Sequence, residues 1–149
     1  MKIVTNIGQV SQAIASKLKV LKDKEYLLRP VSLGLIDKMT KRIHEDGKAS
    51  DGGEIGTYNK DYLKRRQKKP YNRKSDSKII VSLTRQLEND WSVIATQKGY
   101  GIGFKNPFNL QKARWVEQGK QREIFSLTTE EQQYATDYIN ELVSDVLNS

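Results

Sequence analysis

The sequence predicts a single α+β domain in which a small antiparallel sheet packs against amphipathic helices near both ends of the chain. Three observations predict this fold class. The chain has 149 residues, the length of one ordinary domain. Apolar residues recur at three- and four-residue steps near both ends, which is the period of a helix. They alternate with other residues between positions 89 and 105, which is the period of a half-buried strand.

The first half of the chain is predicted to form two helices followed by a loop. Apolar residues at helical spacing predict a helix over 7–21. Pro30 suits the first turn of a helix, and the stripe that follows it predicts a second helix over 31–45, carrying Val31, Leu35, Met39 and Ile43. His44, near the end of that helix, is expected to have a structural or surface role.

The segment 47–59 is predicted to be a surface loop, because glycines and other turn-favouring residues run through it. A loop of this length is not needed to connect two elements of a small domain. We therefore expect it to project and to contact a neighbouring subunit. The candidate contact residues are Asp51, Gly52, Gly53 and Tyr58.

A basic segment, residues 60–78, holds most of the charge excess of the chain. It contains nine Lys and Arg against two Asp, a net charge of +7, whereas the whole chain carries +8. Tyr62 and Tyr71 lie among these cations, as in proteins that bind phosphates and stack on bases. A simple solvated basic face is the alternative. The candidate DNA- or partner-binding residues are Lys64, Arg65, Arg66, Lys68, Lys69, Arg73 and Lys74.

The middle of the chain is predicted to supply the sheet. The run 78–83, KIIVSL, is typical of a short strand. A hairpin is predicted near 89–105, with the turn at 97–99 and with alternating apolar residues on both arms: Trp91, Val93, Ala95, Tyr100, Ile102 and Phe104. Gly101 and Gly103 fall on the opposite face, where they would admit a second backbone or a bend.

The last third is predicted to contain two helices joined by an extended passage. Pro107 ends the hairpin, and a short helix over 110–118 would stop at Gly119. Residues 128–131, TTEE, have the spacing of a capping box and start a terminal helix. We expect its stripe to pack on the hairpin and form the core: Ala135, Tyr138, Ile139, Leu142 and Val146. Trp91 and Trp115 are expected to be core or interface aromatics.

Composition removes several classes of function. The chain has no Cys and a single His, so disulfides, thiolate zinc sites and cysteine nucleophiles are excluded. Asp46, Asp51 and Glu54 are the acids that a metal-dependent nuclease would use, but their spacing matches no ligand signature, and Asp is common in such loops. We expect no catalytic residue, metal or cofactor, and neither a membrane span nor an export signal.

Four short stretches occur in a characteristic order. The first stretch consists of residues 41–43, then Asp51-Gly52-Gly53, then Thr57 and the basic residues 62–66. The other three stretches are residues 83–91, 113–119 and 122–128. This order resembles the neck and tail-completion proteins of tailed bacteriophages, a group that includes head-tail joining and virion morphogenesis proteins. The resemblance covers residues 31–147. Arg85 stands where the family has Gly.

The resemblance implies an α+β fold and a ring of identical subunits, six or twelve copies, between portal and tail in the virion. It implies a structural role without enzymatic activity. The neighbours would be portal, adaptor or tail proteins, with double-stranded DNA in the channel. Two alternatives remain open. One is a stand-alone basic nucleic-acid-binding protein that uses residues 64–74, and the other is a metal-dependent nuclease.

Overall fold

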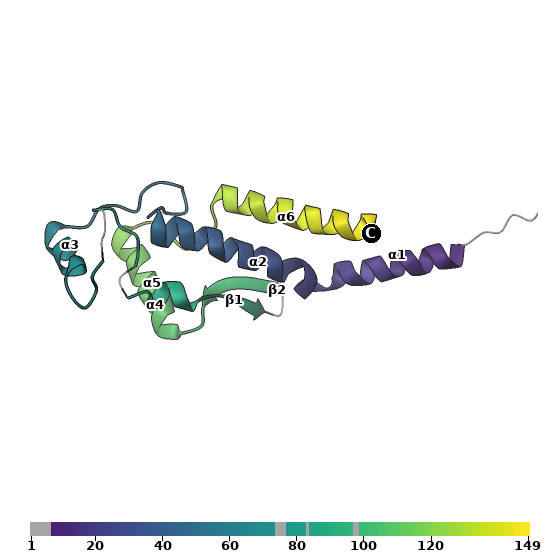
Figure 1. The fold of residues 1–149 in the computed structure, drawn as a ribbon, viewed down its shortest axis with the longest axis horizontal. Coiled ribbons are helices and arrows are strands. Elements are labelled where there is room, and N and C mark those ends of the chain that lie inside the picture. The colour runs from purple at the N-terminus through teal and green to yellow at the C-terminus, as the bar shows by residue number, and fades with distance from the viewer. Residues whose placement is uncertain (1–6, 74–76, 83, 97–98) are drawn as a thin grey trace, which may run out of the picture.

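A central helix organises the structure. The computed structural model describes residues 7–73, 77–82, 84–96 and 99–149. Helix α2 (Lys24–Thr40) lies between helix α6 (Thr129–Asn148) and an antiparallel hairpin of strands β1 (Trp91–Thr96) and β2 (Gly99–Phe104) (Figure 1). The predicted α+β class is confirmed. Among the described helices, none is long and apolar enough to cross a membrane.

Helix α2 starts earlier than predicted. Its N-cap is Asp23, whose carboxylate accepts from the N–H groups of Glu25 and Tyr26 at 3.0 and 3.3 Å. Pro30 therefore lies inside the helix, not at its first turn. Proline at this position lacks the N–H that would donate to the Tyr26 carbonyl. Because Tyr26 is exposed, water can donate to that carbonyl instead. The predicted start at Val31 is wrong because the Asp23 cap outweighs the proline signal.

The end of α2 widens into a π-helical turn, η1 (Lys41–Glu45). The N–H of Asp46 donates to the carbonyl of Lys41 at 2.8 Å, the five-residue spacing of a π-turn. Three consecutive side chains, Arg42, Ile43 and His44, are buried there. His44 is thus an interior residue, not a surface residue.

Helix α1 (Ile7–Lys22) confirms the first predicted helix, and only Asp23 separates it from α2. It extends away from the rest of the molecule at the end opposite to α3 (Lys60–Gln67) (Figure 1). Lys17 ties it to the end of α6 by donating to the Leu147 carbonyl at 2.9 Å. Ile14 and Leu18 remain about half exposed, at 53% and 49%.

The core lies where α2, the hairpin and the 121–127 passage meet. Trp91 and Phe104 face each other across the hairpin with ring centroids 4.7 Å apart, and Phe125 lies 5.7 Å from Trp91. The buried members of this cluster are Met39, Ile43, Ala49, Ile55, Ile79, Trp91, Phe104, Ala113 and Ile124. Trp115, in contrast, is exposed.

The predicted hairpin is confirmed, with Trp91 opposite Phe104 and Val93 opposite Ile102. Strand β2 begins earlier than predicted, because Gly99, which was expected in the turn, pairs with Thr96. Its tip, residues 97–98, lies outside the described residues. A Cβ added to Gly103 would lie 3.0 Å from Ile94 Cδ1. The space beside this glycine is therefore filled by a side chain of the partner strand, and not by a second backbone as the sequence suggested.

The strand predicted over 78–83 is wrong for the described residues 78–82. Only an isolated bridge pairs Lys78 with Thr57. Val81 has a φ of +44°, a left-handed conformation that interrupts an extended run. Position 83 lies outside the described residues.

Two corrections concern helix α5 (Pro107–Lys120), which follows the short helix α4 (Gln86–Asp90) and the hairpin. It begins at Pro107 because the Asn106 side chain caps it, accepting from the N–H of Phe108 at 2.9 Å. Gly119 lies inside the helix, and Gln121, with a φ of +50°, takes the left-handed position expected of a glycine.

The terminal helix α6 has the predicted capping box between Thr128 and Glu131. It packs on α2, which lies between it and the hairpin, so the predicted packing on the hairpin is wrong (Figure 1). The reason is that α2 carries apolar residues on two faces, one for each neighbour. Leu142 is consequently half buried, whereas Val146 is buried.

Candidate assembly interface

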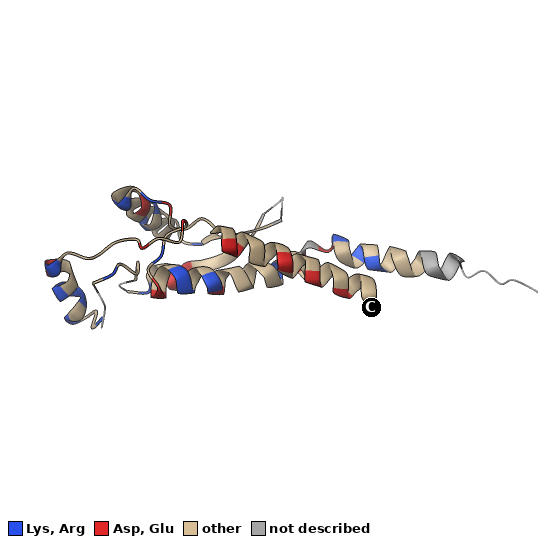
Figure 2. Cartoon of the chain, turned by 90° about the horizontal axis from the view of Figure 1, so that it is seen from above, with Lys and Arg blue, Asp and Glu red and all other residues tan. Residues whose placement is uncertain are grey.

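Helix α3 carries the exposed part of the basic segment. Asn59 caps it by accepting from the N–H of Tyr62 at 2.8 Å. Figure 2 shows Lys and Arg gathered over α3 at one end of the molecule, and Asp and Glu spaced along α6. The exposed cations predicted to bind DNA or a partner are Lys64, Arg65, Lys68 and Lys69. We call these four residues the α3 surface. They line a shallow hollow together with Tyr71.

Three of the seven predicted contact residues do not belong to this surface. Arg66 is 1% exposed, with its guanidinium carbon 4.3 Å from the centre of the Tyr58 ring. Arg73 is half buried, donates to the Ser82 hydroxyl and lies 3.6 Å from a Glu88 oxygen. Lys74 lies outside the described residues. The charge run in the sequence did not reveal that two of its arginines point inward.

The tyrosines of the basic segment are partly used within the protein. The Tyr62 ring lies 5.3 Å from the Tyr58 ring, and Tyr71 lies 5.9 Å from the Arg65 guanidinium. Both Tyr62 and Tyr71 are half buried. The α3 surface therefore offers ammonium and guanidinium groups, which suit phosphates or carboxylates, more than free aromatic faces.

The loop 47–59 folds back on its own chain. The Ala49 N–H donates to the Gly53 carbonyl at 2.8 Å, and the Ser50 N–H donates to the Glu123 carbonyl at 3.0 Å. Gly52, at a φ of +82°, forms the tip. Contact of this tip with a neighbouring subunit stays a prediction, but the loop does not reach away from the body as a free arm.

Arg122 holds Asp51, one of the loop residues predicted as subunit contacts. It lies 2.9 Å from Asp51 Oδ2 and also donates to the Glu54 carbonyl. The hydrogen bond from Arg122 and a second one from the Gly53 N–H keep the pKa of Asp51 below its usual value. Tyr58 is different, because its half-buried hydroxyl accepts from the Ile80 N–H at 3.2 Å, and burial raises its pKa.

Two of the three acids considered for a nuclease are paired with cations of the same chain, whereas the Glu54 side chain is exposed. Asp46 lies 3.0 Å from Lys41 Nζ, and Asp51 pairs with Arg122. Within the part of the chain that the structure describes, no three His, Asp or Glu side chains form a group that could hold a metal ion.

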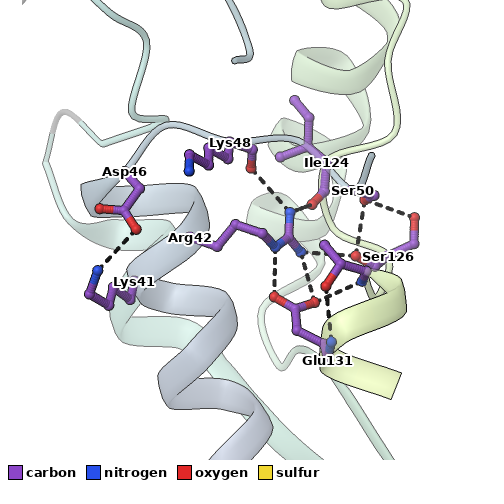
Figure 3. Close-up of polar contacts among 9 residues, drawn as sticks. Lys41, Arg42, Asp46, Lys48, Ser50, Ile124, Ser126 and Glu131 are labelled. Atoms are coloured by element: carbon purple, nitrogen blue, oxygen red, sulfur yellow. Dashed lines mark hydrogen bonds and ion pairs between the residues drawn. The ribbon is translucent and has the colours of Figure 1, made fainter. Parts of the chain in front are cut away.

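A buried ion pair, which the sequence did not predict, links the loop 47–59, the 121–127 passage and α6 to η1. Arg42 Nε donates to Glu131 Oε1 at 2.6 Å, and the guanidinium also donates to the carbonyls of Lys48, Ile124 and Ser126 at 3.1, 3.0 and 2.9 Å (Figure 3). Arg42 thus links η1 to the loop, to the 121–127 passage and to the first turn of α6. The signal in the sequence is a charged residue three positions after Met39, on the apolar stripe.

No family model, no curated protein and no solved structure matches this chain.

The buried His44 gives the first testable prediction. Its Nδ1 lies 3.0 Å from the Val81 carbonyl oxygen. Burial lowers the pKa of His44, and Arg42 acts in the same direction, against the opposing effects of Glu88 and the carbonyls of Val81 and Ile80. The unfolded chain takes up a proton near pH 6.5 and the folded chain resists it. Stability should therefore fall as the pH drops below about 6.5, by at most about 1.4 kcal/mol per pH unit.

Thermal melts at pH 7.5 and 5.5 check this prediction. We expect the wild type to melt at a lower temperature at pH 5.5, and His44→Gln to lose most of that difference. An equal pH dependence in His44→Gln would show that another group is responsible.

Proposed function

We propose that this chain is a structural, non-enzymatic subunit of a phage head-to-tail connector, as a neck or tail-completion ring that joins the portal side to the tail around the DNA exit channel. The resemblance of its four stretches to that family motivates the proposal. Their placement supports it, because the Arg42 network ties the first stretch to the fourth within one body.

The observation that carries the proposal is the presence of two unlike exposed surfaces at opposite ends of an elongated chain. One end presents the α3 surface, and the other presents the exposed apolar residues Ile14, Leu18 and Val20 of α1 (Figure 1). In a ring of identical subunits, which heterologous contacts close, α1 would supply the contact between copies and the α3 surface would stay free for another partner. Apolar side chains left in water on a projecting helix favour burial against a partner.

In this proposal the α3 surface faces a polyanion, either the DNA in the channel or an acidic neighbouring protein. Each subunit of a ring would contribute the same cations, so the combined field would be strong at close range. Contacts to phosphates from Lys and Arg position a protein on DNA without reading its sequence, which suits a passage for a whole genome.

The second candidate is a stand-alone nucleic-acid-binding protein, because the α3 surface would serve it equally well. It is less well supported, since the exposed apolar residues of α1 have no role in it. The test that separates the two is the location of the chain in phage particles. As a connector subunit it should be found at the head-tail junction of the virion, and as a free nucleic-acid-binding protein it should not.

A further inference from the structure

A cavity of about 790 Å³ separates α3 from helices α4 and α5. One wall comes from α3 and the residues before it, including Tyr58, Tyr62 and Arg66. The opposite wall comes from α4 and α5, including Leu87 and Val116. The function proposed above makes no use of this cavity.

The feature that points to a ligand is the side chain of Arg66 in the cavity wall. Arg66 is 1% exposed, and its Nε and Nη2 have no hydrogen-bond acceptor among the described residues. Its nearest partners are the rings of Tyr58 and Tyr62, with centroids 4.3 and 5.9 Å from the guanidinium carbon. An arginine cannot lose its charge at any ordinary pH, and a buried charge without a counter-ion is costly.

The geometry of the unpaired atoms narrows the ligand class. Nε and one Nη form a single edge of the guanidinium, and this edge matches two oxygens of one carboxylate or phosphate group. The rim adds the exposed cations Arg85, Lys112 and Lys120. Glu88 is the acidic residue in the lining. Its Oε1 lies 3.6 Å from Arg73 Nη2 and has no hydrogen-bond partner among the described residues.

The remaining lining is apolar and aromatic, which favours a protein ligand. Leu87, Val81 and Val116 are half buried around the cavity, and Trp115 is 62% exposed on its rim. A carboxylate side chain in a peptide brings apolar neighbours that can cover these residues. The backbone of duplex DNA is uniformly charged and offers no apolar side chain that could cover these residues.

We propose that this cavity is a docking site for an acidic peptide segment of a partner protein, with one Asp or Glu carboxylate bound by Arg66 and an adjacent apolar side chain packed against Val116 and Trp115. The inference does not depend on the connector function and would hold if that function were refuted. It also gives Arg66 a role distinct from that of the α3 surface.

The test uses the full chain and two matched arrays of acetylated hexapeptide amides. One array has a central Glu flanked by Leu, Phe, Val or Ile, and the other has Gln in place of Glu. The variants are Arg66→Met, which keeps the length and apolar packing of the side chain, and Arg65→Met, which removes an exposed cation from the same helix. Affinity is measured through the fluorescence of Trp115, with Trp91→Phe as the background.

We expect at least one Glu peptide to bind the wild type about tenfold or more tightly than its Gln counterpart, because a charge-assisted hydrogen-bond pair is lost in the Gln peptide. Arg66→Met should remove the difference, and Arg65→Met should keep it. The inference would be overturned if no Glu peptide were preferred, or if Arg65→Met abolished the preference as fully as Arg66→Met. It would also be overturned if inorganic phosphate or duplex DNA bound as tightly as the best Glu peptide and competed with it.

Two controls keep the test decisive if Arg66→Met folds poorly. Arg66→Lys retains the charge but not the two-pronged edge, so it should also lose most of the Glu preference. The second control uses NMR on the unmutated protein. The chemical shift of the Arg66 Nε–H group should change when the best Glu peptide is added and should stay the same when its Gln counterpart is added. An unmoved resonance at saturating Glu peptide would contradict the assignment.

Discussion

Replacing Glu131 with Gln is expected to lower the free energy of unfolding by about 3 to 5 kcal/mol. The substitution keeps the size of the side chain and leaves an oxygen that can still cap α6. What it removes is the charge opposite Arg42, whose side chain is 9% exposed and would be left buried without a counter-ion. The total stability of such a domain is about 5 to 15 kcal/mol, so the variant should be close to unfolding at ordinary temperature.

The matched control for this prediction is Glu130→Gln, an exposed acid in the same helical turn. It should change stability by less than about 0.5 kcal/mol. Chemical denaturation of the three proteins gives the comparison. If Glu131→Gln were no more destabilising than Glu130→Gln, the Arg42 network would not hold the loop, the 121–127 passage and α6 together.

The second large effect is expected on assembly. Reversing the α3 surface, by changing Lys64, Arg65, Lys68 and Lys69 to Glu, should abolish the formation of infectious particles while leaving the melting temperature nearly unchanged. The reason is that all four side chains are exposed, and the contact of Arg65 with the Tyr71 ring, at 5.9 Å, is too loose to contribute much to stability. Arg66 is left out of this variant because it is buried.

A matched quadruple variant tests whether the location of the charge matters, and not merely its amount. Arg29, Lys38, Lys105 and Arg114 are also exposed and lie outside both α1 and the α3 surface, and changing them to Glu alters the net charge equally. Complementation of a phage that lacks the gene should succeed with this control and fail with the α3 variant. Normal particle yield from the α3 variant would refute a role of the α3 surface in assembly.

Local signals in the sequence predicted the elements well. The Thr128–Glu131 spacing predicted the start of α6, and the alternation around Trp91 and Phe104 predicted the hairpin, although not its register. Both depend on residues that are close in sequence, so neither needs knowledge of the tertiary fold. The same locality explains the error at Pro30, because proline is typical of a first helical turn, whereas the Asp23 side chain caps the helix earlier in the chain.

Features set by long-range packing were not predictable in the same way. Nothing in the stripe of α6 says whether it meets the hairpin or α2, because both partners present an apolar face. The candidate site shows the same limit. A run of cations looks uniform in sequence, yet Arg66 and Arg73 point inward, and the Arg42–Glu131 pair joins residues 89 positions apart.

The most direct test of the proposal that this chain is a connector subunit is a cryo-EM reconstruction of the phage particles to which it would belong, together with a count of the chain in those purified particles. The proposal predicts a ring of this chain at the head-tail junction, with α3 directed at the DNA or at an acidic neighbouring protein. It also predicts that particles made without the chain consist of separate heads and tails. Complete, infectious virions without any copy of the chain would contradict the proposal.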